Sequence, residues 1–307
     1  MRTAIYSLFA LGALAAPSLA QLTNIAPLGT ASQSSTYVTY SDAGRAIDGF
    51  PTTVWSFGIL NRLSSTGGAP GSWWQLDFPT PFEVSEVVLF NRSDCCALRL
   101  SNFRILVELD GVEVFGADYF VGSGSVSAGG IVSLDVPPGT MVDRVRVELI
   151  NGLNNEGNGF LTLAEVEVLS PPIGSVYCSP AAVNIDGRRA RLSAVGTASA
   201  SSPDATAIVC QGLNELTFGF FLVGDLSNQV APPGSNGVFC LGGNIGRYSN
   251  FIFDTARSEN MALVIDRSAV PGNPVHPILA GETWRFQAWY RDGASSNFSD
   301  AVAVTFL

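Results

Sequence analysis

Short runs of alternating hydrophobic and polar residues fill the chain between residues 22 and 168. The clearest run, at 144–149, reads Arg-Val-Arg-Val-Glu-Leu, which is the period of a strand with one buried face. No stretch of a dozen residues carries a convincing 3.6-residue period, and Asp110-Gly111 between two apolar runs is typical of a hairpin turn. The pattern predicts an antiparallel β-sandwich with strands at 73–78, 82–90, 103–109, 112–115, 131–136 and 142–150.

The same strand-and-turn pattern continues in the second half of the chain. Between the halves, the segment 170–174 reads Ser-Pro-Pro-Ile-Gly, and its two prolines are expected to stop both helix and sheet. The sequence therefore predicts an all-β protein with one domain at 21–169, a linker at 170–174 and a second β-rich, sandwich-like domain at 175–307. Strands of the second domain are expected at 189–195, 216–223, 237–241, 251–254, 261–265, 283–290 and 301–306.

The first twenty residues have the pattern of a secretory signal peptide. Arg2 precedes an apolar stretch at 4–16, and small residues at 18–20 suit a cleavage site. We therefore expect a secreted, extracellular protein that starts near Gln21. The apolar stretch is too short to span a bilayer, and no later segment is long enough. Secretion favours disulfides, but the chain has 5 cysteines, so at least one thiol is free or pairs outside the chain.

Composition narrows the classes of function. A length of 307 residues suits two domains, and 47% hydrophobic residues with 32 Gly and 17 Pro suit folded, loop-rich β domains. The net charge of −10 argues against nucleic acid or an anionic membrane as partner. The single histidine, His276, lies in a Pro-rich turn, and no zinc spacing or phosphate loop is present, so we do not expect an enzyme.

One short stretch concentrates the candidate chemistry. It runs from Asn91 to Arg99, directly after a predicted strand, and holds Arg92, Asp94, the adjacent cysteines Cys95 and Cys96, and Arg99. A disulfide between adjacent cysteines would form a rigid apolar knob beside two forked cationic donors, which suits the C–H face and hydroxyl edge of a sugar. Alternatively, the cysteines have separate partners and the arginines are solvated charges. Chemistry alone leaves both interpretations open.

The pattern Arg-x-Asp-Cys-Cys-x-x-Arg at 92–99 resembles the signature of the F-type lectins, the fucose-binding branch of the discoidin-like (coagulation factor type C) β-sandwiches. Further similar pieces lie at 24–34, 46–49, 73–77 and 161–168, so the resemblance covers about half of the chain. It implies a discoidin-like jelly-roll topology for the first domain. It also implies that the protein is a lectin whose partners are fucosylated or related glycans.

The resemblance also implies a role for each site residue. Arg92 and Arg99 would donate to oxygens of fucose, Asp94 would orient them, and the Cys95–Cys96 disulfide would pack on the sugar. The family pattern has a histidine where this chain has Ser65, which reaches less far and offers no ring. An upstream aromatic residue would lie under the sugar methyl group; the candidates, each more often ordinary packing, are Tyr37, Tyr40, Trp55 and Phe57.

Members of the family also carry a structural calcium ion. The matching carboxylates are Asp48 and Glu165, and the backbone oxygens are those near Arg45, Phe50 and Ala164. Hard oxygen ligands from a loop and a distant strand are what calcium requires. The alternative is that Asp48 caps a turn and Glu165 is an exposed strand residue.

The second half resembles a module that recurs at the C-terminal end of secreted bacterial proteins, which has no assigned function. Of its three cysteines, we favour a Cys178–Cys240 pair with Cys210 as a small buried residue. Two rival functions remain open. One is a discoidin-like adhesion or scaffold protein that has lost sugar binding, and the other is the accessory binding domain of a carbohydrate-active enzyme.

Overall fold

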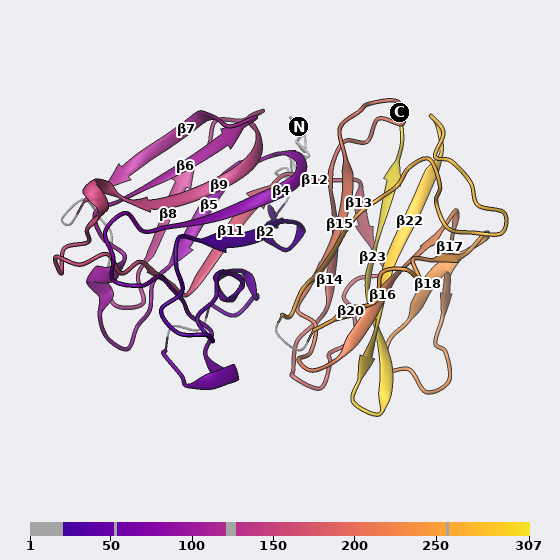
Figure 1. Cartoon of the computed structure of the whole chain (residues 1–307). Coiled ribbons are helices and arrows are strands. Elements are labelled where there is room, and N and C mark those ends of the chain that lie inside the picture. Colours follow the sequence, from indigo (N-terminus) through magenta and orange to yellow (C-terminus); the bar gives the residue numbers. More distant parts are fainter. Residues whose placement is uncertain (1–20, 52–53, 121–126, 256–257) are drawn as a thin grey trace, which may run out of the picture.

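The computed structural model describes residues 21–51, 54–120, 127–255 and 258–307. It contains two β-sandwiches that lie side by side (Figure 1). In the described residues the helical elements are short 3₁₀ turns, and none is long and apolar enough to cross a membrane. The predicted all-β class is therefore confirmed. The proposed signal peptide, residues 1–20, lies outside the described residues.

The N-terminal sandwich is formed by β1 (Thr23–Asn24), β2 (Thr30–Gln33), β3 (Ser64–Ser65), β4 (Trp73–Glu83), β5 (Glu86–Phe90), β6 (Phe103–Leu109), β7 (Val112–Tyr119), β8 (Ile131–Asp135), β9 (Met141–Leu149), β10 (Thr162–Leu163) and β11 (Glu165–Ser170). One sheet has the order β2-β4-β9-β6-β7 and the other β1-β11-β5-β8, with β3 and β10 as a separate ribbon. Every neighbouring pair is antiparallel, as the alternating pattern predicts.

Strand β9 shows how the alternation builds this sandwich. Val145 and Val147 are fully buried in the core between the two sheets. The intervening arginines lie on the outer face, where Arg144 donates to Asp77 at 2.6 Å. Trp74, on the neighbouring strand β4, is also fully buried, and its indole N–H donates to a backbone carbonyl at 3.0 Å. Burial of the apolar stripe thus fixes which face of the sheet turns inward.

The C-terminal sandwich is formed by β12 (Pro172–Ile173), β13 (Ser175–Tyr177), β14 (Arg191–Gly196), β15 (Thr206–Gln211), β16 (Phe218–Gly224), β17 (Leu226–Val230), β18 (Phe239–Gly242), β19 (Gly246–Arg247), β20 (Phe253–Asp254), β21 (Met261–Val264), β22 (Thr283–Asp292) and β23 (Ser295–Thr305). One sheet has the order β12-β14-β15-β21, and the other β13-β23-β22-β16-β19 with β20 also paired to β16. Strands β17 and β18 form a ribbon beside them.

The segment expected to be a linker is a strand instead. Pro172 and Ile173 pair with Val195 and Ala194 of β14, and the chain then crosses at Gly174 into the opposite sheet. The expectation that two prolines exclude a sheet was wrong because β12 is an edge strand. An edge strand needs hydrogen bonds on one side only, so a missing N–H is tolerated there.

The cysteines pair as the sequence analysis favoured. Cys95 is bonded to Cys96, and Cys178 is bonded to Cys240, which joins the start of the second domain to β18. Cys210 is free and fully buried in the second hydrophobic core.

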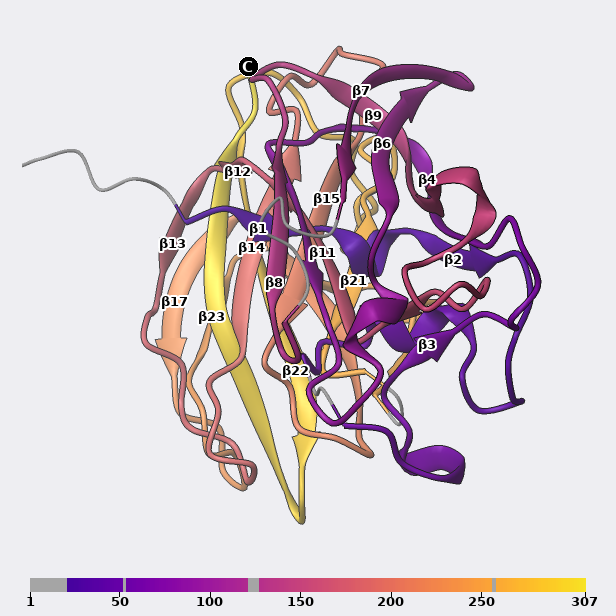
Figure 2. The same ribbon diagram turned by 90° about the vertical axis from the view of Figure 1, so that its left-hand side faces the viewer.

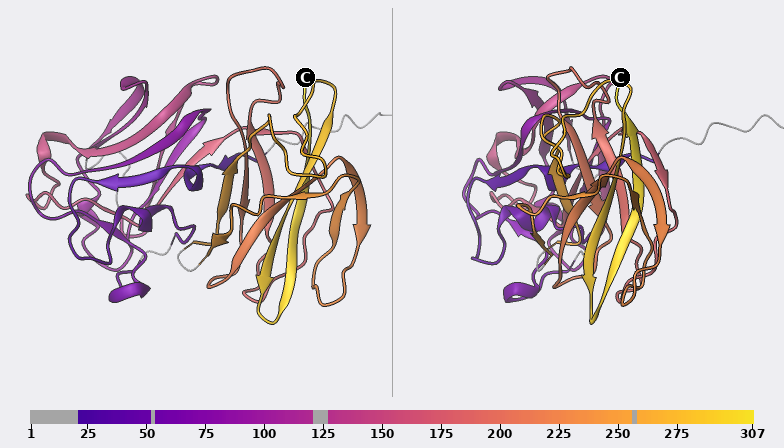
Figure 3. Two further views of the ribbon diagram at one scale, coloured as in Figure 1. Left: turned by 45° about the vertical axis from the view of Figure 1, so that its right-hand side comes forward. Right: turned by 90° about the vertical axis from the view of Figure 1, so that its right-hand side faces the viewer.

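The two sandwiches share buried surface. The N-terminal hydrophobic core includes Val195 and Ala207, which belong to β14 and β15 of the C-terminal sandwich. The interface also has a polar end, where Arg62 forms an ion pair with Glu215 at 2.9 Å. Figure 2 looks onto the N-terminal sandwich, and Figure 3 turns the C-terminal sandwich toward the viewer. Apolar packing and charge pairing together hold the two domains against each other.

Gly174, at the crossover between the two sheets, should tolerate no side chain. It has φ of +75°, and a Cβ there would lie 2.3 Å from the carbonyl oxygen of Ala303. We expect Gly174→Ala to lower the free energy of unfolding by at least about 2 kcal/mol, since the left-handed backbone alone costs about 1–2 kcal/mol. Urea denaturation measures it. Gly139→Ala is the control, because φ is +80° there but no atom lies within 4 Å; equal losses would contradict the steric account.

Candidate functional site

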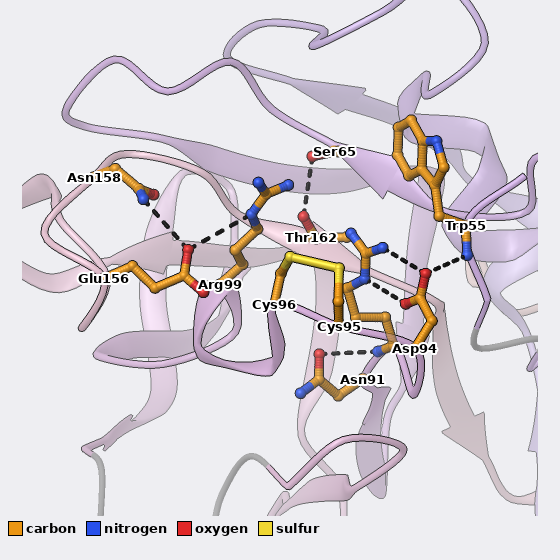
Figure 4. The surroundings of a disulfide bond; sticks show 11 residues. Trp55, Ser65, Asn91, Asp94, Cys95, Cys96, Arg99, Glu156, Asn158 and Thr162 are labelled. Atoms are coloured by element: carbon orange, nitrogen blue, oxygen red, sulfur yellow. Dashed lines mark hydrogen bonds and ion pairs between the residues drawn. A yellow bond between two sulfur atoms is a disulfide. The ribbon is translucent and has the colours of Figure 1, made fainter. Parts of the chain in front are cut away.

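The arginine and dicysteine stretch forms a loop between β5 and β6 (Figure 4). Residues Ala97–Arg99 form a 3₁₀ turn, and Cys96 before it adopts a left-handed backbone with φ of 55°. Asn91 fixes the base of the loop, because its side-chain amide donates to the carbonyl of Ala97 at 3.0 Å and to that of Ser127 at 3.3 Å. The Cys95–Cys96 disulfide thus lies between Arg92 and Arg99 in the sequence of the loop, and Figure 4 shows it beside Arg99 and Asp94.

Arg92 is clamped by Asp94. Its Nε and Nη2 donate to the two carboxylate oxygens of Asp94, each at 2.7 Å, and the backbone N–H of Trp55 donates to the same carboxylate at 3.0 Å. The hydrogen bonds from Arg92 hold the pKa of Asp94 well below its usual range. Such a forked, charge-assisted pair fixes the plane of the guanidinium. Asp94 therefore fixes the orientation of Arg92.

Arg99 is held by residues that the sequence analysis did not single out. Its Cζ lies 4.3 Å from the ring centroid of Phe160, and its Nε lies 3.8 Å from Oε2 of Glu156. The amide of Asn158 approaches the same Glu156 oxygen at 3.4 Å. Glu156, rather than Asp94, is thus the acid nearest to Arg99. The Asn- and Gly-rich run at 151–159 was the available signal, since it marks a long loop after a strand.

Aromatic rings surround both arginines. The Trp55 ring centroid lies 5.6 Å from Cζ of Arg92, and the Tyr37 and Tyr40 rings each lie 6.0 Å from that of Trp55. Tyr37 also meets Phe160 edge to face at 5.3 Å. Three of the four aromatic candidates therefore gather here. Phe57, the fourth, is 82% exposed and lies on the loop beyond Trp55.

Arg92 and Ser65 are both buried at this site. The side chain of Arg92 is only 4% exposed, because Asp94 and the Trp55 ring cover it. Ser65 was expected to face the sugar, but it is fully buried and its hydroxyl forms a hydrogen bond with that of Thr162 at 3.0 Å. This hydrogen bond, drawn in Figure 4, lies within the β3–β10 ribbon, where Ser65 pairs with Thr162.

A second candidate site joins Asp48 and Glu165, which are 3% and 0% exposed. Glu165 Oε1 accepts the N–H of Gly49 at 3.0 Å, and Asp48 accepts Nη1 of Arg62 at 3.3 Å. Glu165 Oε2 is buried without any hydrogen bond. Burial raises the pKa of Asp48 to about 7, and burial together with the neighbouring Asp48 raises that of Glu165 well above its usual value.

An orphaned buried carboxylate oxygen fits a bound cation. Two neighbouring buried carboxylates destabilise the fold unless a proton or a cation lies between them. Of this pair, Arg62 contacts Asp48 but not Glu165. The described residues contain no group of three or more His, Cys, Asp or Glu side chains that could hold a metal ion by themselves. A cation here would therefore complete its coordination with backbone carbonyls, for which the expected residues Arg45 and Ala164 are both buried.

Comparisons with known proteins show what the first domain is similar to. Residues 45–147 match the model of the F5/F8 type C family, described as a NedA-like, galactose-binding domain. The matched residues all lie within the N-terminal sandwich. Fucolectin-1 of Anguilla japonica is 35% identical over 88 residues, which cover 27% of this chain and 48% of that relative. Fucolectin-6 of the same eel is 31% identical over 88 residues, or 46% of its length.

The chain thus spans about half the length of the curated relatives it matches. Among solved structures, a fucose-binding module of Streptococcus pneumoniae, SpX-3, is 30% identical, with 48% of this chain and 97% of the module covered at a TM-score of 0.40. The predicted resemblance of the N-terminal domain to fucolectins is confirmed by the curated relatives. The resemblance of the C-terminal half stays a prediction.

The buried carboxylate pair predicts a pH dependence in the absence of divalent cations. Because the folded-state pKa of Asp48 is raised to about 7, the folded protein binds more protons than the unfolded chain between about pH 4 and 7. Stability should therefore rise as pH falls from 8 to 5.5, by roughly 1–3 kcal/mol. Melting curves in chelator measure it. Glu165→Gln should reduce the change of stability with pH, whereas Asp135→Asn, at an exposed position, should not. Equal pH dependence in the unmodified chain and both variants would contradict the role of the buried pair.

Proposed function

We propose that the N-terminal domain, which contains the match to the F5/F8 type C family model, is a lectin domain that binds fucose or a similar deoxysugar. The observation that carries this proposal is that one short loop holds the Cys95–Cys96 disulfide together with Arg92, which Asp94 fixes, and Arg99, which rests on the Phe160 ring. Such a surface offers forked donors for ring and hydroxyl oxygens and an apolar knob for a C–H face. The fucolectins to which the domain is similar support the choice of sugar.

The two arginines would contribute differently. Arg92 uses Nε and Nη2 for Asp94, so its remaining donors would bind the sugar from a fixed position. Arg99 rests on the Phe160 ring, and its terminal nitrogens form no hydrogen bond within the described residues. Arg99 would therefore supply most of the free donors. Ser65 would contribute at most indirectly, because its hydroxyl is already paired with Thr162.

The wider proposal is a secreted binding protein whose partners are fucosylated or related glycans. The only histidine of the chain, His276, belongs to the C-terminal domain and is not part of the arginine site. In the described residues, carboxylates at the arginine site serve as partners of guanidinium groups rather than as a free acid and base pair.

We also propose a structural calcium ion at Asp48 and Glu165. The two carboxylates would hold it together with backbone oxygens of Arg45, Phe50 and Ala164. A bound calcium ion would supply the positively charged partner that Glu165 lacks. With the ion bound, Asp48 and Glu165 would both stay ionised. Their shared coordination would tie the 43–50 turn to β11.

Replacing either arginine by alanine should weaken fucose binding roughly ten- to hundredfold, since each loss removes charged hydrogen bonds worth about 1.5–3 kcal/mol. Lysine should rescue poorly because it lacks the planar fork. Calorimetry with L-fucose on the full chain measures the affinities. Arg92→Ala should also lower the melting temperature, since it leaves Asp94 unpaired.

Arg104→Ala is the matched control, because Arg104 lies on the outer face of the sheet and pairs with Glu113 and Asp118. It should leave the affinity unchanged. If Arg99→Ala binds fucose as tightly as the unmodified chain while remaining folded, the pocket lies elsewhere.

Removal of calcium should lower the melting temperature of the protein. Binding to the folded state alone adds stability by mass action, about 2.7 kcal/mol at a hundredfold excess over Kd. Melting curves in millimolar calcium and in chelator give the shift. Glu165→Gln should abolish the shift and Asp135→Asn should preserve it. Melting curves that coincide in calcium and in chelator would contradict the proposed calcium site.

A further inference from the structure

A groove lies at the junction of the two sandwiches, away from the arginine and disulfide loop. Its volume is about 960 Å³. One wall is the start of β1, at Leu22 and Thr23, and the other is β14 with the end of β15. The crossover at Gly174 and residues of β23 also line it. Grooves between domains are a common place for ligand sites, and this one contains no residue of the arginine site or of the Asp48 and Glu165 pair.

The groove is rich in polar side chains. Arg191 and Ser193 alternate along β14, and Gln211 lies opposite Arg191 in the strand pair. Arg189 and Asp300 complete the charged lining together with Arg188. Arg188 is already paired with Asp186 and Glu259, so Arg189 and Arg191 against Asp300 leave the groove with a small excess of positive charge in a chain whose net charge is −10.

Arg191 is unusual among the arginines of this protein. In the described part of the chain, every other arginine has a hydrogen bond, an ion pair or an aromatic ring against its guanidinium. Arg191 is exposed and has none within the described residues, although its charge acts on Asp300. A forked guanidinium without an acceptor in a groove is ready to bind an oxyanion bidentately.

Asp300 is not free to neutralise Arg191 fully. Its Oδ1 accepts the N–H of Leu192 at 2.6 Å, and its own N–H donates to the carbonyl of Ala190. These bonds fasten β23 to β14 at the base of the groove and hold the carboxylate in place. The carboxylate is only 6% exposed, so the accessible charge of the groove is that of Arg189 and Arg191.

The geometry points to a second binding site in this groove, for an acidic sugar residue of a glycan. Arg191 would bind its carboxylate or sulfate, while the Gln211 amide and the Ser193 hydroxyl, which both donate and accept, would bind neighbouring hydroxyls. A glycan is the proposed occupant because Arg191 and Ser193 alternate along one strand with Gln211 opposite Arg191, so that their groups can bind the closely spaced oxygens of a sugar ring. This site is independent of the one proposed for fucose.

The test uses calorimetry on the full chain with three probes of equal length. They are tetragalacturonate, which carries carboxylates, a chondroitin sulfate tetrasaccharide, and neutral cellotetraose. We expect binding of at least one acidic probe, none of cellotetraose, and a loss of at least tenfold in Arg191→Ala. Arg191→Lys should recover only part of the affinity. Which acidic probe binds more tightly decides between carboxylate and sulfate.

Arg291→Ala is the matched control, since it removes one exposed arginine charge from the same domain outside the groove. It should change the affinity less than twofold, and Arg92→Ala should leave acidic-sugar binding intact. The proposal is overturned if neither acidic probe binds, if Arg291→Ala weakens binding as much as Arg191→Ala, or if a tetraglutamate peptide binds more tightly than both glycans.

Discussion

The contact between the 43–50 turn and β11 is the constraint on which the N-terminal sandwich and its neighbour both depend. Glu165 Oε1 accepts the N–H of Gly49, so a strand at the centre of one sheet holds a turn that precedes it by more than a hundred residues. The carbonyl of Asp48 in turn accepts the N–H of Glu259 from the C-terminal domain at 3.0 Å. Two buried carboxylates therefore lie where loop, strand and second domain meet, and their charge state affects all three.

At the arginine loop, each guanidinium group is positioned by a carboxylate and an aromatic ring, but the two arginines are held with different strength. Asp94 grips Arg92 through two short hydrogen bonds, which favours a single orientation. Arg99 has a looser carboxylate at 3.8 Å but a closer ring at 4.3 Å. In the proposed sugar site, Arg92 would be a donor of fixed orientation and Arg99 a donor that can adjust to the ligand. The price is the desolvation of Arg92.

Sequence predicted the elements of this protein better than their surroundings. Alternation along 144–149 and the Asp110-Gly111 turn identified β9 and the β6–β7 hairpin, because one buried face imposes a period of two. The adjacency of Cys95 and Cys96 identified the loop. Burial of Ser65 and the pairing of Arg99 with Glu156 were not predictable, since both depend on segments about a hundred and about sixty residues away. The strand at Pro172 was missed because edge position is a property of the assembled sheet.

The shared hydrophobic packing at Val195 and Ala207 has a consequence for modularity. A domain that can be moved freely between proteins normally keeps its core to itself, whereas here two residues of the second sandwich complete the core of the first. The two sandwiches should accordingly behave as one cooperative folding unit. During evolution, an exchange of the C-terminal partner would have to carry this apolar patch, and the charges that face Arg62, along with it.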